Sequence, residues 1–208
     1  ARGDDISVDR CLREARAAGY AGIELGHKLP RDAEALRALL APRGLELISG
    51  WYGGRVSERG AARELEAAEA QVDLLRAFGC EVLVYAEVAG CVHGTMGQPI
   101  EARRCLAPSA LMDFGRELTA FAEALRGRGL DLAYHHHMGT IIQTGDELER
   151  LLASTGDVVG LTVDTGHLAF AGADPGEIVR RFGPRVKHVH LKDVRGSVLA
   201  SVTRGAGS

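Results

Sequence analysis

The sequence predicts an α/β protein in which the strands run parallel in one sheet. Short runs of aliphatic residues alternate along the whole chain with segments whose apolar residues recur every three or four positions. Strands separated by helical crossovers pair in parallel, so this alternation favours a parallel sheet. The 208 residues are 46% hydrophobic, which is enough for one sizeable core. We therefore expect a single domain over residues 1–208, because no linker or change of composition divides them.

The expected elements follow one another as helix and strand from the first residues to the last. Ser7, Asp32 and Asp174 each precede an apolar helical stripe and are side chains that cap a helix N-terminus. Thr144 and Glu147 have the three-residue spacing of a capping box. In chain order we expect a helix after Ser7, a strand over 21–26, a helix after Asp32, a strand over 45–52, a helix over 61–78, a strand over 80–86, a helix capped by Ser109, a strand over 130–136, a helix after Thr144, a strand over 158–164, a helix after Asp174 and a strand over 186–191.

One connection, over residues 87–108, is long for a compact domain and has no clear periodicity. Connections of this length between a strand and a helix are either functional loops or surface insertions. The sequence leaves both interpretations open.

Charge and cysteine content narrow the classes of function. Lysine plus arginine number 25 and aspartate plus glutamate 28, for a net charge of −3, so nothing favours a nucleic acid or an anionic membrane as partner. No apolar run is long enough to cross a membrane. The four cysteines are far apart and contain no Cys-x-x-Cys pair, which favours reduced thiols and a cytoplasmic location. A homo-oligomer stays open.

Ionisable side chains gather where the expected strands end. Because strand residues alternate between two faces, each of four strands carries such a group on the face with its smaller residues: Glu24, His135, Asp164 and His190. In (β/α)₈ barrels the active site is built at the carboxyl ends of several strands. A dinucleotide-binding sheet needs Gly-x-Gly-x-x-Gly after its first strand, and the sequence lacks it. We therefore predict a (β/α)₈ barrel.

Imidazole and carboxylate groups that converge from neighbouring strands are a ligand set for Mn²⁺, Co²⁺, Zn²⁺ or Fe²⁺. We predict His135, Asp164 and His190 as metal ligands. Alternatives stay open: Asp164 as a helix cap only, and His188 as a core histidine. His136 lies on the opposite face of its strand and is expected to pack outward under a helix, away from the metal.

Several motifs together resemble one family. They lie at 19–26 (GYAGIELG), 49–52 (SGWY), 84–87 (VYAE), 93–94 (HG), 134–140 (YHHHMGT), 163–170 (VDTGHLAF) and 187–194 (KHVHLKDV). They resemble the myo-inosose-2 dehydratases, of the xylose isomerase-like TIM barrel superfamily, over nearly the whole chain. The resemblance implies a (β/α)₈ barrel that converts 2-keto-myo-inositol (scyllo-inosose) to a trihydroxycyclohexane-1,2-dione in inositol catabolism. It also implies dependence on Mn²⁺ or Co²⁺ and an association with glutathione.

The resemblance also carries expectations for single residues. In the superfamily the metal ligands are Glu, Asp, His and Glu from strands five to eight. Asp164 and His190 match the second and third of these, and His167 matches a histidine that contacts substrate. His135 stands where the superfamily has the strand-five glutamate, which is a departure from the pattern. The first and eighth strands have no counterpart, so we expect an incomplete barrel.

Dehydration beside a ketone needs a base for the α-carbon proton and an acid for the leaving hydroxyl. A divalent metal would stabilise the enediolate. Candidates for the acid and base are His167, Glu87, His137 and Lys192, and candidates for contacts to a cyclic polyol ketone are Glu24 and Trp51. Three alternatives stay open: a sugar isomerase or epimerase acting through the same enediolate, a trinuclear-zinc DNA-repair endonuclease, and a metal-free sugar-binding barrel. The net charge of −3 disfavours the endonuclease.

Overall fold

The computed structural model describes residues 6–95 and 97–205, and the other residues of the expected single domain, 1–5, 96 and 206–208, lie outside that description. Within the described residues, six parallel strands form one sheet in the order β1-β2-β3-β4-β5-β6. The strands are β1 (Gly22–Leu25), β2 (Glu46–Gly54), β3 (Val82–Glu87), β4 (Asp131–Tyr134), β5 (Gly160–Asp164) and β6 (Val186–His190). The predicted α/β class and parallel sheet are confirmed.

Helices separate all of these strands along the chain. The α-helices are α1 (Val8–Ala17), α2 (Ala33–Leu40), α3 (Val56–Arg59), α4 (Ala61–Ala77), α5 (Pro108–Gly127), α6 (Gly145–Ala153), α7 (Thr165–Phe170), α8 (Pro175–Phe182) and α9 (Gly196–Gly205). The 3₁₀ helices are η1 (Ala41–Arg43), η2 (Ile100–Ala102) and η3 (Gly183–Arg185).

The cap residues show why the helices begin where they do. Side chains of Ser7, Asp32 and Asp174 accept hydrogen bonds from the first turns of α1, α2 and α8, as predicted. Thr144 and Glu147 form the predicted capping box of α6. The expectation for Ser109 is wrong: α5 begins at Pro108, with Ala107 as the N-cap residue, since proline at the first helical position has no N–H to satisfy.

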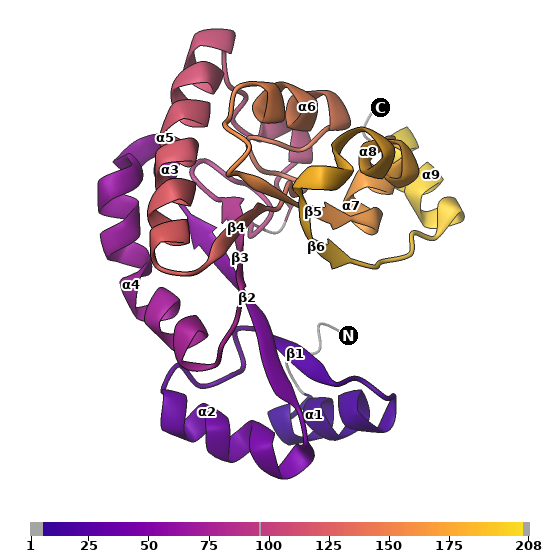
Figure 1. The fold of residues 1–208 in the computed structure, drawn as a ribbon. Helices are drawn as coiled ribbons and strands as arrows, with labels where there is room; N and C mark the ends of the chain where they lie inside the picture. The colour runs from indigo at the N-terminus through magenta and orange to yellow at the C-terminus, as the bar shows by residue number, and fades with distance from the viewer. Residues whose placement is uncertain (1–5, 96, 206–208) are drawn as a thin grey trace.

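The sheet is a curved arc with two open edges, β1 and β6 (Figure 1). Helices α4 and α5 lie along the outer side of its central strands (Figure 1). The described helices include none that is both long and apolar enough to span a membrane.

Aromatic side chains fill the layer between the sheet and α5. Tyr85 of β3 and Tyr134 of β4 are fully buried, with ring centroids 6.0 Å apart. Phe121 of α5 lies 5.6 Å from the Tyr85 ring. Burial of several aromatic rings contributes a large share of core stability. This packing fixes the strands whose carboxyl ends carry the site.

Candidate metal and catalytic site at the carboxyl ends of the strands

Asp164 is the last residue of β5 and lies at the centre of the site. Its side chain is fully buried. Oδ1 accepts a hydrogen bond of 2.9 Å from the backbone N–H of His167, so Asp164 also caps α7. The cap predicted as an alternative role is therefore present, and it occupies one of the two carboxylate oxygens.

The other oxygen, Oδ2, is surrounded by nitrogen atoms from three segments of the chain. They are Nε2 of His135 at 3.1 Å, Nδ1 of His190 at 3.4 Å, Nε2 of His167 at 3.9 Å and Nζ of Lys192. The three predicted ligands His135, Asp164 and His190 thus lie in one cluster, together with two of the four predicted acid–base candidates. Their binding of a metal stays a prediction.

A second group of side chains adjoins this cluster. Oε2 of Glu24, on β1, lies 3.2 Å from Nε2 of His188 and 3.2 Å from Nε2 of His190. The Ser49 hydroxyl on β2 donates to the same oxygen over 2.8 Å. His190 therefore connects the two groups, with one ring nitrogen toward Asp164 and the other toward Glu24.

Two further imidazoles, those of His93 and His137, lie beside this cluster. The ring centroids of His137 and His167 are 4.0 Å apart, and those of His93 and His137 are 4.7 Å apart. His93 belongs to the long connection after β3, which is tied to the loop after β4: Val92 N donates to Gly139 O over 2.8 Å. The connection therefore forms part of the rim of the site.

The two acidic groups are held ionised by their partners. Burial favours the neutral form of Asp164, but the adjacent nitrogens of His135, His190 and Lys192 outweigh it and hold the pKa of this carboxyl well below its usual range. The pKa of Glu24 is lowered in the same way, because hydrogen bonds from His188 and His190 outweigh burial. Both groups are therefore carboxylates at neutral pH.

The histidines divide into one charged ring and several neutral ones. The adjacent carboxylates of Asp164 and then Glu24 raise the pKa of His190 to about 9. Burial lowers the pKa of His137 to about 4, and burial with the neighbouring His137 lowers that of His167 to about 3. Neutral rings can pack closely and keep a free nitrogen lone pair for a proton or a metal.

The donor set fits a divalent metal. Nδ1 of His190 is a buried nitrogen without a hydrogen-bond partner and lies 3.4 Å from the ionised carboxylate of Asp164, which Nε2 of His135 faces from another segment. Ligand atoms of His135, Asp164 and His167 lie within 4.8 Å of one another, as do those of Glu24, His188 and His190. Unpartnered imidazole nitrogens next to a carboxylate are a poor arrangement for a protein alone and a suitable one for a cation.

The other predicted site residues lie farther from this cluster. The Glu87 carboxylate accepts from the Tyr85 hydroxyl over 2.6 Å and from the Ser57 hydroxyl over 3.1 Å, so the structure does not bring it to Asp164. Trp51 lies two residues beyond Ser49 on β2, half-buried and on the same strand face. For both, the predicted roles stay predictions.

His136 differs from its expected position in one respect: it follows strand β4 and is not part of it. Strand β4 ends at Tyr134, before the predicted end at residue 136, so the three histidines 135–137 follow the strand. His136 is fully buried, and its Nδ1 lies 3.3 Å from the backbone oxygen of Gln143. It turns toward the loop before α6 and makes no direct contact with Asp164 in the described hydrogen bonds.

The sequence left the role of His188 open and gave His93 no place. His188 and His190 are two residues apart on one strand, so alternation indicated their shared face, but it did not distinguish a core histidine from a site residue. No such signal exists for His93, because its loop has no periodic pattern.

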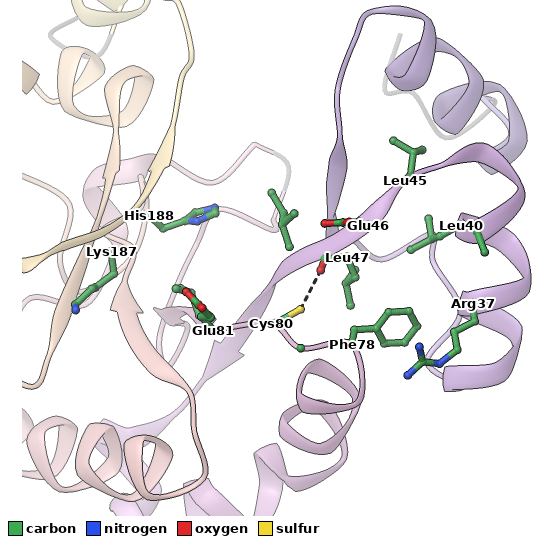
Figure 2. A pocket seen from close by; sticks show the side chains of 14 residues that line it. Arg37, Leu40, Leu45, Glu46, Leu47, Phe78, Cys80, Glu81, Lys187 and His188 are labelled. Atoms are coloured by element: carbon green, nitrogen blue, oxygen red, sulfur yellow. Dashed lines mark hydrogen bonds between the residues drawn. The ribbon is translucent and has the colours of Figure 1, made fainter.

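The amino-terminal ends of the strands carry a separate cavity of about 660 Å³ (Figure 2). Its lining comes from the end of α2, the segment between α4 and β3, and the starts of β2, β3 and β6, and it includes Glu46, Glu81, Lys187 and His188. His135 and Asp164 are not among the residues that line it. The cavity therefore lies outside the cluster around Asp164.

Relatives were found by sequence. Residues 12–206 match the xylose isomerase-like TIM barrel family. The chain is 46% identical to the rhizopine catabolism protein MocC of Rhizobium meliloti over 98% of its own length and 62% of that protein. It is 33% identical to an inosose dehydratase of Clostridium perfringens, over 97% of the chain and 69% of that enzyme. The chain thus spans between three fifths and seven tenths of these two relatives.

Solved structures share the fold. A probable 3-DHS dehydratase, AsbF of Bacillus anthracis, superposes with a TM-score of 0.70 at 18% identity, over 93% of this chain and 70% of that one. The IolI protein with a binding zinc atom gives 0.63 at 15% identity, over 91% and 69%. Together with the family match and the six parallel strands, these findings mean that the chain belongs to the xylose isomerase-like TIM barrel family and groups there with the inosose dehydratases.

Proposed function

We propose that the protein containing this chain is a divalent-metal dehydratase that acts on 2-keto-myo-inositol (scyllo-inosose). The α-carbon loses a proton, the neighbouring carbon loses its hydroxyl, and the two leave as one water molecule. The enol that remains rearranges to a trihydroxycyclohexane-1,2-dione. The reaction needs a binding site for a cyclic polyol ketone, a base and an acid.

One observation carries the proposal: four nitrogen donors converge on Oδ2 of the buried Asp164 at the carboxyl ends of the strands. This is the end at which barrels of this type build their active sites. The relatedness to inosose dehydratases, 33% over 97% of the chain, supports the substrate class.

His135, Asp164 and His190 would hold the metal, and His167 lies within reach of the same position. When bound, a divalent cation supplies positive charge that stabilises the negative oxygen developing beside the α-carbon. Mn²⁺ and Co²⁺ both suit carboxylate and imidazole ligands without thiolate.

The proton transfers fall to side chains at the rim of the cluster. His167 and His137 are neutral imidazoles that face each other, so one ring can accept a proton while the other stays neutral. Lys192 brings an ammonium group to Asp164, where it can donate a hydrogen bond to a substrate oxygen. Trp51 is proposed to contact the ring face of the substrate.

Product analysis tests the proposal. The complete gene product, supplied with Mn²⁺, is incubated separately with scyllo-inosose and with a ketohexose, and the products are identified by mass spectrometry. Loss of one water from the inosose and no reaction of the ketohexose support a dehydratase. An isomer of unchanged mass from either substrate contradicts it and favours an isomerase or epimerase.

A further inference from the structure

We infer that Glu24 is a positioning residue: its carboxylate accepts Nε2–H of His190 and thereby turns Nδ1 of that ring toward the metal position beside Asp164. The inference rests on the proposed metal centre. It gives Glu24 a role that acts through another residue, in addition to the predicted contact with substrate.

The contacts of Glu24 support this role. Ser49, His188 and His190 all approach one oxygen, Oε2, at 2.8, 3.2 and 3.2 Å. The Ser49 hydroxyl donates from the neighbouring strand β2 and so fixes the carboxylate in place. An ionised carboxylate only accepts hydrogen bonds, so the His190 nitrogen that faces it must carry the proton.

The opposite side of the His190 ring has the complementary property. Nδ1 lies 3.4 Å from Oδ2 of Asp164 but makes no hydrogen bond there. A cation that binds beside Asp164 would take the place of the proton on Nδ1, while the proton on Nε2 stays with Glu24. A carboxylate that fixes the tautomer and orientation of a metal-binding histidine is a recurring arrangement around metal ions, and its loss weakens binding about 10–100-fold.

Glu24, His188 and His190 also have the composition of a metal site, and their ligand atoms lie within 4.8 Å of one another. The hydrogen-bond inventory favours the positioning role. Nδ1 of His190 is buried without a hydrogen-bond partner and lies 3.4 Å from Oδ2 of Asp164. Oε2 of Glu24 and Nε2 of His190 already satisfy each other.

The test measures metal affinity and the tautomer of His190 in the complete gene product. Variants are Glu24→Ala, which removes the acceptor, and Glu24→Gln, whose amide oxygen can still accept from Nε2–H. Glu46→Ala serves as the matched control, because this residue is an exposed glutamate at the start of the neighbouring strand. Zn²⁺ binding is followed by competition with a chromophoric chelator, and ring ¹⁵N–¹H correlations with His190→Asn as assignment reference report the tautomer.

We expect one Zn²⁺ per chain, lost in Asp164→Asn, and a His190 ring protonated at Nε2 alone in the Zn²⁺-loaded protein. Glu24→Ala should weaken Zn²⁺ binding about 10–100-fold and abolish the single tautomer, while Glu24→Gln recovers most of both. Glu46→Ala should match the wild type.

Three results would overturn the inference. Wild-type affinity and an unchanged tautomer in Glu24→Ala would overturn only the positioning role of Glu24 and would leave the proposed metal centre intact. Two Zn²⁺ per chain, one of them lost in Glu24→Ala, would make Glu24 a ligand instead. No Zn²⁺ bound by the wild type would overturn the metal centre, and the inference with it.

Discussion

The imidazole rings of His137 and His167 pack with their centroids 4.0 Å apart, which joins the loop after β4 to helix α7. Both rings are kept neutral, since burial lowers the pKa of His137 to about 4 and that of His167 to about 3. At neutral pH each ring therefore has an unprotonated nitrogen that can accept a proton from the substrate. The pair is the best-placed acid–base unit beside Asp164.

Replacing His167 with glutamine should lower kcat by about 10²–10⁴-fold while the metal content stays at the wild-type level, because an acid–base group is lost. Steady-state kinetics and metal analysis of the same preparation check this. His27→Gln, in an exposed position after β1, is the control. A stoichiometric loss of metal in His167→Gln would show that this residue is a ligand.

Replacing Asp164 with asparagine should abolish turnover and metal binding but leave the protein folded. Asparagine caps helix N-termini as well as aspartate does, so the hydrogen bond to His167 N can be kept. The lost charge weakens the hold on a cation. Circular dichroism checks that the variant is folded, and metal analysis checks that the cation is lost. Asp157→Asn, at an exposed position, is the control. Normal turnover with normal metal content would reduce Asp164 to a helix cap.

The metal-free protein should lose stability as the pH is lowered from about 6.5 toward 4. Burial lowers the pKa of His136 to about 4, so the unfolded chain binds more protons than the folded one in this range. For this residue alone the difference amounts to roughly 3 kcal/mol. Urea unfolding with a chelator at several pH values measures it. The slope should flatten in His136→Gln, and an unchanged slope would contradict the assignment.

Packing of α5 against the segment after α6 can be tested with a pair of glycines in one helix. A Cβ on Gly115 would lie 2.5 Å from the backbone oxygen of Ser154, whereas one on Gly127 would meet nothing within 4 Å. Gly115→Ala should lower the free energy of unfolding by about 1–3 kcal/mol. Gly127→Ala should raise it by up to about 1 kcal/mol. Equal effects of both changes would contradict this packing.

The sequence was sufficient to predict the strands of the sheet, because buried parallel strands are continuous apolar runs between helices with clear caps. Their ends were less predictable. Histidines 135–137 continue the alternation of β4 although the strand ends at Tyr134. The short α3 and the start of α5 at Pro108 depend on local packing and the missing N–H of proline, which periodicity does not report.

The site could be predicted only in part. Strand alternation predicted which faces carry Asp164 and His190, but it gives no distance between residues of different strands. Glu24 and His190 lie 166 positions apart and meet through the curvature of the sheet. Glu87 was a plausible candidate at a strand end, yet alternation gives it the face of Tyr85, where it is hydrogen-bonded.

The most direct test of the account is turnover measured against metal content. The complete gene product is stripped of metal with a chelator and titrated with Mn²⁺. Consumption of scyllo-inosose and formation of the trihydroxycyclohexane-1,2-dione are then followed together. We expect turnover to rise in proportion to bound metal up to one ion per chain, and not at all in Asp164→Asn. Full dehydration by the stripped protein, or Mn²⁺-dependent dehydration by Asp164→Asn, would contradict a catalytic metal centre at Asp164.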